Sequence, residues 1–171
     1  MYLKDKRLIV RPANRNDAQT LCKWWNDGKV MAHAGFPNGI QTDIDKLIDR
    51  LSKENDNTRI LIIETDSNRI GEMSYRIEDS IAEIGIKICD FSYQEKGYGT
   101  EAIKMLIRYL FDDMKVKKII LDTNLNNTRA QHVYDKIGFK KIAVRKDSCK
   151  DQLGEWQSAV DYELMREDFY G

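Results

Sequence analysis

The stretch that decides the fold runs from residue 94 to residue 100 and reads Gln94-Glu95-Lys96-Gly97-Tyr98-Gly99-Thr100. It follows a run, Ile84 to Ile88, in which isoleucine alternates with other residues as in a half-buried strand. Apolar residues at helical spacing come after it, from Ile103 to Met114. A glycine loop that enters a helix leaves backbone N–H groups unpaired, and the helix dipole adds partial positive charge there. The stretch therefore predicts a cradle for a phosphate group, which Gly97 and Gly99 let approach the backbone closely.

A dinucleotide site is a second interpretation of the same glycines. Gly97-x-Gly99-x-x-Ala102 fits the dinucleotide fingerprint, and Asp122 ends the next apolar run, close to where a ribose-binding acid belongs. Residues 90–96 separate the strand from the first glycine, however, and the chain after Asp122 is too short for a second βαβαβ half. The strand patterns before the loop also follow one another with short turns, as in an antiparallel meander: 59–64, 70–77 and 81–89. A glycine-rich turn without a ligand is a third interpretation.

The remaining patterns predict one α/β domain over residues 1–171. A strand at 8–10 precedes a helix capped by Asn16, and Thr42 caps a second helix after a loop or broken helix at 28–41. After the meander come a helix, a strand, a helix opened by Asn127 and stopped by Gly138, and two strands: 98–115, 118–123, 127–138, 139–146 and 156–165. The order β-α-α-β-β-β-α-β-α-β-β implies a mixed, mostly antiparallel sheet with helices on both faces.

Composition excludes some classes of function. The chain has 28 basic and 28 acidic residues, which argues against nucleic acid binding driven by net charge. No apolar run approaches the length of a membrane span, and the first residues lack the apolar segment of a signal peptide. Three separated cysteines fit a reducing cytoplasm and no metal-ligand spacing, so we expect no metal and treat Cys89 as a small buried hydrophobe.

Two motifs together resemble the GNAT superfamily of N-acetyltransferases. The first is the loop Gln94-x-x-Gly97-x-Gly99, which is similar to the family's acetyl-CoA pyrophosphate loop. The second lies at the family's expected distance and reads Asn127-x-x-Ala130-x-x-x-Tyr134-x-Lys136-x-Gly138-Phe139. The segment 90–99 looks especially like the branch that includes ribosomal-protein N-terminal acetyltransferases and spermidine acetyltransferases. The resemblance covers nearly the whole chain, and the expected element order matches the family's layout.

The resemblance implies acetyl-CoA as cofactor and assigns residues to it. Backbone N–H groups of 95–100 hold the pyrophosphate, the Asn127 side chain contacts the pantetheine arm, and an N–H near Ile88 receives the developing oxyanion. Glu95 is unusual beside a diphosphate, and we expect its side chain to point to water with Lys96 offsetting its charge. The predicted cofactor residues are Ile86, Ile88, Gln94, Glu95, Lys96, Gly97, Tyr98, Gly99, Thr100, Asn127 and Ala130.

Acetyl transfer to an amine also needs an acid and a base. A primary amine with a pKa of about 10 must lose a proton, and the departing thiolate must gain one or accept a hydrogen bond. The resemblance makes Tyr134 the acid. Ala82-Glu83-Ile84 resembles the segment that carries the base of histone acetyltransferases in this superfamily, and Glu72 on the neighbouring strand is a second candidate. Antiparallel pairing would place both carboxylates on one face, where repulsion raises one pKa. A chain of water molecules is the third possibility.

The acceptor amine is the least determined part of the prediction. In this fold the acceptor lies over the first helices and the following loop, which here offer Trp24, Trp25, Asp27, His33 and Phe36. Aromatic rings with an acid can hold a cation, although tryptophans at these positions also pack in cores. A polyamine, an aminoglycoside and a protein N-terminus all remain open, as do a homodimer and an inactive acyl-CoA-binding sensor.

Overall fold

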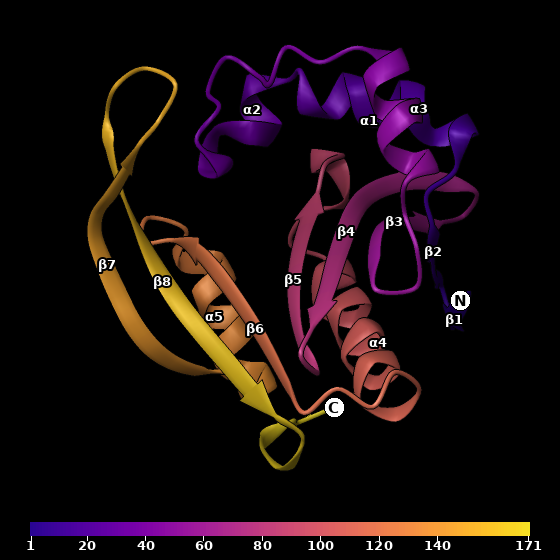
Figure 1. The fold of residues 1–171 in the computed structure, drawn as a ribbon, viewed down its shortest axis with the longest axis vertical. Helices are drawn as coiled ribbons and strands as arrows, with labels where there is room; N and C mark the ends of the chain where they lie inside the picture. Colours follow the sequence, from indigo (N-terminus) through magenta and orange to yellow (C-terminus); the bar gives the residue numbers. More distant parts are fainter.

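The computed structural model describes residues 1–171 and contains one mixed sheet of eight strands (Figure 1). The strands are β1 (Leu3–Asp5), β2 (Leu8–Pro12), β3 (Thr58–Thr65), β4 (Asn68–Glu78), β5 (Ile81–Ile88), β6 (Lys118–Asn124), β7 (Lys140–Lys150) and β8 (Trp156–Met165). Their spatial order is β1-β2-β3-β4-β5-β6-β8-β7, and only the neighbours β5 and β6 are parallel. The predicted antiparallel meander is therefore present as β3, β4 and β5.

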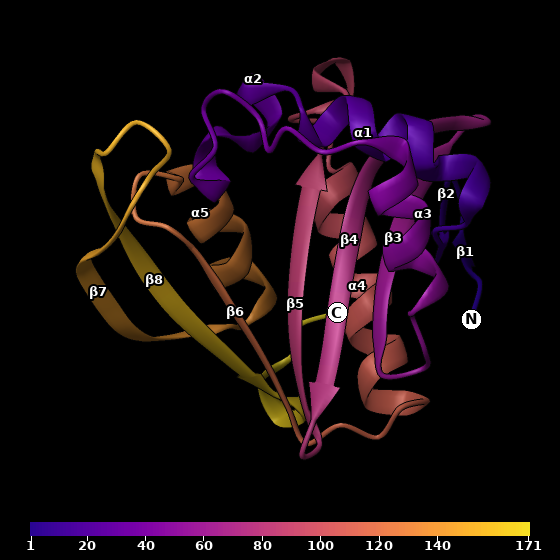
Figure 2. The ribbon, with the colours of Figure 1, turned by 45° about the horizontal axis from the view of Figure 1, so that its top comes forward.

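The sheet opens into two wings where β5 and β6 meet. These strands pair only over Ile81 to Glu83 and Lys118 to Ile120, and beyond this point they diverge (Figures 1 and 2). One wing consists of β1 to β5 and the other of β6, β8 and β7. Because backbone groups beyond Glu83 have no strand partner on that side, the opening leaves a free strand edge inside the sheet.

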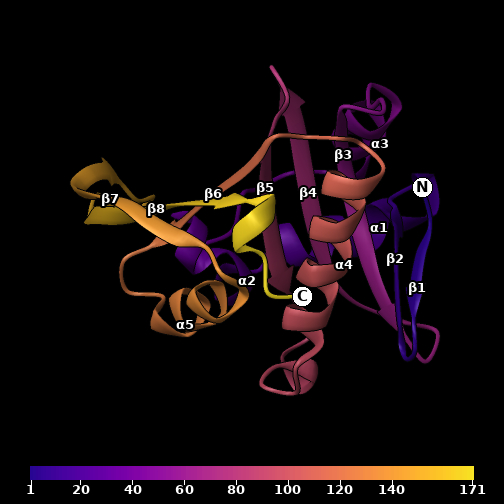
Figure 3. The same ribbon diagram turned by 90° about the horizontal axis from the view of Figure 1, so that it is seen from below.

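Helices cover both faces of the sheet, as the sequence predicted. They are α1 (Ala18–Trp25), α2 (Gly28–Met31), α3 (Ile44–Ser52), α4 (Tyr98–Asp112) and α5 (Thr128–Ile137). Neighbouring β3 residues point to opposite faces: Leu61 packs in the cluster that includes α4 and α5, and Ile62 in the cluster of α1 and α3. Figure 3 shows α4 along the first wing and α5 against the second.

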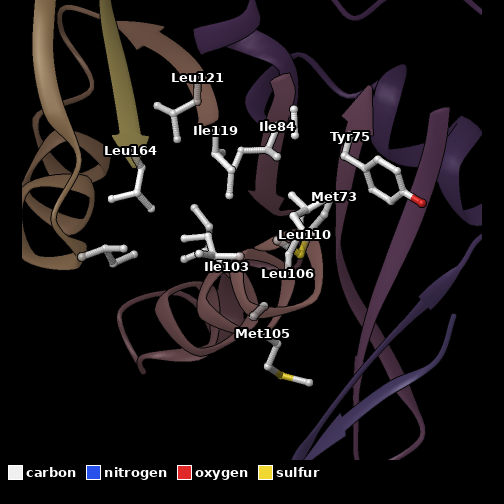
Figure 4. Close-up of a cluster of buried hydrophobic side chains, with 14 of the residues drawn as sticks. Met73, Tyr75, Ile84, Ile103, Met105, Leu106, Leu110, Ile119, Leu121 and Leu164 are labelled. Atoms are coloured by element: carbon white, nitrogen blue, oxygen red, sulfur yellow. The ribbon is translucent and has the colours of Figure 1, made fainter. Parts of the chain in front are cut away.

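Two apolar clusters form the core. The larger has 25 buried residues and joins α4 to the sheet through side chains such as Leu106 and Leu110 (Figure 4). The smaller has nine buried residues and lies between β3, α1, α2 and α3. The periodic apolar face of α4 predicted this burial, because residues three and four apart share one side of a helix. No helix of the structure is both long enough and apolar enough to cross a membrane.

Two predicted helix caps were wrong. Asn14, not Asn16, caps the short 3-10 turn before α1, and its side chain accepts a hydrogen bond from the Asn16 N–H at 2.9 Å. Asp43, not Thr42, caps α3 by accepting from the Lys46 N–H at 2.8 Å. Both errors have one cause, because several capping residues stand close together and only tertiary contacts select among them. The sequence also missed strand β1, of three residues, while the expected loop or broken helix at 28–41 contains the four-residue helix α2.

Asp17 ties the first wing together through a buried ion network. Its carboxylate is fully buried and accepts hydrogen bonds from Arg11 at 2.8 Å, from Arg69 at 2.7 Å and from the Asn14 N–H at 2.8 Å. Burial acts to raise the pKa of Asp17, but the hydrogen bonds from Arg11, Asn14 and Arg69 outweigh it and hold the pKa below its ordinary value. The network fixes β2 and β4 against the turn that starts α1.

Candidate active site

The loop between β5 and α4 has the unpaired backbone N–H groups that the sequence predicted. Six successive backbone N–H groups, those of residues 95 to 100, make no hydrogen bond within the protein, and the first bonded N–H of α4 is that of Glu101, to the Gly97 carbonyl at 3.0 Å. Gly97 has φ 84°, in the left-handed region that glycine enters without strain, and Glu95 has φ 61°. A run of unpaired donors at the positive end of a helix fits an anion such as a diphosphate.

Two arginines hold this loop from opposite sides. Arg7 donates to the Lys96 carbonyl at 2.9 Å, pairs with Glu101 and stacks over the Tyr98 ring at 4.0 Å. Arg129 on α5 donates to Gln94 Oε1 at 3.0 Å and to Glu95 Oε1 at 3.2 Å. These contacts orient the loop without using its N–H groups, because both arginines bind oxygen atoms.

The Glu95 side chain is exposed, as expected, but its expected charge partner was wrong. Its carboxylate pairs with Arg129 rather than being offset by its neighbour Lys96. The sequence could not show this, since Arg129 lies 34 positions away and reaches the loop only because α5 and α4 face each other across the opening. The Tyr98 side chain packs within the protein, because its ring lies against that of Tyr93 with centroids 5.6 Å apart.

The free edge of β5 begins beside the phosphate loop. The Cys89 N–H donates to the Ile70 carbonyl at 2.9 Å, on the β4 side. Because N–H groups alternate in direction along a strand, those of Ile88 and Ile86 face the opening where β6 has diverged. The Ile88 carbonyl faces away from β4 as well and accepts from Gln94 Nε2 at 3.0 Å. These two N–H groups are placed to bind an extended chain and a carbonyl oxygen.

Helix α5 forms the other side of the opening, and the second motif lies on it. Asn127 caps the helix as predicted: its Oδ1 accepts from the Ala130 N–H at 3.3 Å, which leaves its Nδ2 without a hydrogen bond. Gly138 ends the helix with φ 114°. The buried face includes Tyr134, whose ring meets those of Phe139 and Tyr162 edge-on at 5.8 and 5.6 Å.

The Tyr134 hydroxyl is protonated at neutral pH. Burial raises the pKa of Tyr134 to about 12, and the nearby Tyr162 and Asp122 add to this rise. No protein group hydrogen-bonds its hydroxyl. The side chain is therefore an unengaged O–H donor at neutral pH.

The two candidate bases share a face of the sheet but do not form the expected pair. Glu72 lies opposite Lys87 and Glu83 opposite Arg76, so four positions of the β4–β5 ladder separate them, about 13 Å at roughly 3.3 Å per residue. Each has a basic partner, Lys87 at 3.5 Å for Glu72 and Arg76 at 2.8 Å for Glu83. The prediction of a mutually repelling carboxylate pair was thus wrong, because register sets the distance along a strand.

Only one of these carboxylates lies near the open edge. Glu72 is buried, with 6 % of its surface exposed, and sits beside Ile88 in the ladder. Glu83 is half exposed and lies where β5 and β6 are still paired, about 16 Å from Ile88 at roughly 3.3 Å per residue. Glu72 therefore has the better position for chemistry at the opening.

The region predicted for the acceptor divides into buried and exposed residues. Trp24 and Trp25 are 8 % and 7 % exposed and pack in the smaller core cluster, and Arg50 already covers the Trp25 ring at 5.1 Å. This burial argues against direct contact between either ring and an amine. Phe36 is 38 % exposed, and Asp27 and His33 are also exposed. Asp27 caps α2 by accepting from the Lys29 N–H at 2.9 Å.

Cys89 follows β5 and is buried, as expected for a small apolar side chain. Burial raises the pKa of its thiol far above the ordinary value, and the negative charges of Glu72 and Asp27 raise it further. Cys89 packs in the smaller apolar cluster with Met31, so α2 lies on the same face of the sheet as the end of β5. No group of three or more His, Cys, Asp or Glu side chains is arranged to hold a metal ion.

Comparison with known proteins agrees with this geometry. Residues 7–140 match the family model of the acetyltransferase (GNAT) domain. An uncharacterized N-acetyltransferase of Bacillus subtilis, YnaD, is 25 % identical over 99 % of both chains. The crystal structure of a Vibrio cholerae spermidine N-acetyltransferase in complex with CoA and spermine superposes with a TM-score of 0.86 at 21 % identity, covering 96 % of this chain and 98 % of that chain. An aminoglycoside N(6')-acetyltransferase of Klebsiella pneumoniae is 41 % identical over 27 % of this chain and 23 % of its own.

The chain belongs to the GNAT family, whose class is that of the acetyl-CoA-dependent N-acetyltransferases. The family predicted from the two motifs is confirmed, and so is the predicted single-sheet α/β fold. The dinucleotide interpretation fails on the same findings. Asp122, its proposed ribose ligand, is paired with Arg145 at 3.0 Å.

Proposed function

We propose that this enzyme transfers the acetyl group of acetyl-CoA to a primary amine of a small molecule, by direct attack within a ternary complex. One observation carries the proposal: six unpaired N–H groups of residues 95–100 adjoin the free edge of β5. This arrangement suits a ligand with a diphosphate followed by an extended arm that ends in a carbonyl group.

The chain offers a partner for each part of acetyl-CoA. The loop residues Glu95 to Thr100 would hold the diphosphate, the Asn127 Nδ2 would contact the pantetheine arm, and the Ile88 N–H would receive the thioester oxygen. A Cβ at Gly99 would lie 3.5 Å from the Ile88 side chain, so glycine leaves this space beside β5 unfilled. When bound, acetyl-CoA supplies an activated acetyl thioester.

Tyr134 is proposed as the donor to the leaving sulfur. A phenol with a pKa of about 12 remains protonated over the working range, so its O–H is always available. A free thiol has a pKa of about 8.5, which makes full proton transfer from Tyr134 unfavourable. Its contribution is therefore a hydrogen bond that strengthens as negative charge develops on sulfur.

Glu72 is proposed as the group that takes the proton from the attacking amine, directly or through water. Its carboxylate is buried at the open edge, and Lys87 orients it from 3.5 Å. Glu83, favoured by the sequence pattern, lies at the closed end of the opening and is bound by Arg76. The positions of the two side chains therefore support Glu72 as the base, although the motif Ala82-Glu83-Ile84 favoured Glu83.

A small amine is favoured as the acceptor. Similar proteins are named for spermidine and aminoglycosides, both of which carry primary amines. Asp27 and Phe36 offer a carboxylate and an exposed ring at the start and the turn of one loop, a combination that attracts a cation. A protein N-terminus and an inactive acyl-CoA sensor are the competing functions.

The first experiment is calorimetric titration with acetyl-CoA, NAD and NADP, followed by a thiol-release assay with spermidine, kanamycin and an alanine-terminated peptide. Binding of acetyl-CoA alone, with thiol release on one of the two small amines, is the expected result. Binding without turnover on any acceptor would favour the sensor. Failure to bind acetyl-CoA would refute the proposal.

A further inference from the structure

The turn between β7 and β8 is hydrogen-bonded to the loop after α2 through one residue, Gln152. Its N–H donates to the Gly35 carbonyl at 2.9 Å, its Oε1 accepts from the Asn38 N–H at 2.8 Å, and its Nε2 donates to the Gly39 carbonyl at 2.9 Å. These partners lie 113 or more positions away in the sequence. Figures 1 and 2 both show this turn beside the loop that follows α2.

The turn itself is rigidly built and anchored to the second wing. The Asp151 carboxylate accepts from the N–H groups of Leu153 and Glu155, both at 2.9 Å, and from Gln157 Nε2 at 3.0 Å. Gln157 in turn accepts from Asn124 Nδ2 at 2.9 Å, at the end of β6. Gln152 is thus presented from a fixed position relative to the open end of β6.

The loop on the other side, residues 26–42, is closed at its base, and its tip is bonded to the β7–β8 turn. Asn26 donates to the Thr42 carbonyl at 2.8 Å and accepts from the Thr42 N–H at 2.7 Å. Helix α2 in this loop packs with Cys89, at the end of β5, through Met31, and the loop carries Phe36 next to the residues that Gln152 binds. Its tip therefore adjoins the proposed acceptor side of the site, and Gln152 makes the hydrogen bonds between this loop and the second wing.

We propose that Gln152 is a positioning residue that fastens loop 26–42 to the β7–β8 turn and thereby shapes the amine-binding half of the site. The two wings are paired through only three residues of β5 and three of β6, all at the far end of the opening. At the open end no strand pairing joins the wings, and the hydrogen bonds of Gln152 there fix the position of the loop segment that carries Phe36. Gln152 itself does not touch the reacting atoms. This inference rests on the proposed function.

The cofactor half of the site makes the test selective. The phosphate loop is held by Arg7 and Arg129, and none of its contacts involves Gln152 or loop 26–42. Weakening the Gln152 tie is therefore expected to raise the KM for the amine while leaving the binding of acetyl-CoA unchanged. A role in stability alone would affect both halves, because unfolding removes both.

The experiment compares Gln152→Ala and Gln152→Met with the wild-type enzyme and with Leu153→Ala. Methionine keeps the length of glutamine but removes both side-chain hydrogen bonds, and Leu153 is the neighbouring tip residue, 59 % exposed. We expect both Gln152 variants to raise the KM for spermidine or kanamycin about tenfold, with the acetyl-CoA Kd within about twofold. Leu153→Ala is expected to match the wild type.

Hydrogen exchange of the amides at 35–39 provides a readout independent of catalysis. The Asn38 N–H should be protected in the wild type and should exchange faster in both Gln152 variants. An unprotected Asn38 N–H in the wild type, an unchanged amine KM in both variants, or an equal rise in the acetyl-CoA Kd would overturn the inference. If the wild type acetylates no amine, the proposed function fails, while the exchange measurement still decides whether the tie exists.

Discussion

Replacing Tyr134 by phenylalanine tests the proposed chemistry with little disturbance of the fold. The change removes one hydroxyl that no protein group hydrogen-bonds, so no partner is left unsatisfied. We expect the free energy of unfolding to stay within about 0.5 kcal/mol of the wild type. The ring contacts with Phe139 and Tyr162 are retained, because phenylalanine has the same ring.

The size of the catalytic effect follows from the pKa of the donor. At a pKa of about 12, the phenol lies well above a thiol at about 8.5, so Tyr134 stabilises the departing sulfur by a hydrogen bond rather than by complete proton transfer. Loss of one such donor lowers kcat about 10²-fold, equivalent to about 2.7 kcal/mol. The Kd for acetyl-CoA should not change, because the interaction develops only in the transition state.

The assay is thiol release at saturating acetyl-CoA, with Tyr162→Phe as a matched control. Tyr162 packs edge-on against Tyr134, and its hydroxyl is fully buried without a partner, so its loss should leave kcat within about twofold. In the wild type, log(kcat/KM) should rise with pH as the amine deprotonates and show no fall between about pH 7 and 10. An unchanged kcat in Tyr134→Phe, or a falling limb in that range, would refute the assigned role.

Three further predictions concern carboxylates. Glu72→Gln should lower kcat at least about tenfold, whereas Glu83→Gln should stay within about twofold; the reverse order in a thiol-release assay would restore Glu83 as base. Glu95→Gln should lower the acetyl-CoA Kd about threefold by calorimetry, less so at high salt, and a weaker affinity would show that its pair with Arg129 is needed. Asp17→Asn should cost about 3–5 kcal/mol in urea unfolding at pH 7. Folding lowers the pKa of Asp17, so its contribution to stability is full above the unfolded-state pKa of about 3.9 and is lost as pH falls through the lower folded-state pKa. The difference in unfolding free energy between wild type and Asp17→Asn should therefore shrink in acid. A difference that stays constant with pH would contradict the network.

Sequence reasoning succeeded for features that depend on the local backbone. Gly97 and Gly99 between a strand and a helix predicted unpaired backbone N–H groups, and those of residues 95–100 are a direct consequence of that order. Asn127 and Gly138 likewise predicted both ends of α5, because capping depends on neighbouring residues.

Sequence reasoning was less successful where residues from distant segments meet. Glu83 was favoured as base from its neighbours, yet strand register places Glu72 at the open edge. Arg7 and Arg129, which hold the phosphate loop, carry no local signal that links them to it. Trp24 and Trp25 were candidates for binding an amine, and helix packing buried both.

The sequence by itself therefore determined the family, the order of elements and the loop with unpaired N–H groups before α4. These features depend on dihedral preferences, periodicity and capping, which act over a few neighbouring residues. Only the tertiary structure decided where β5 and β6 part, which carboxylate faces the opening and how Gln152 joins loop 26–42 to the β7–β8 turn. Those features depend on strand register and on contacts between residues far apart in the chain, which no local pattern encodes.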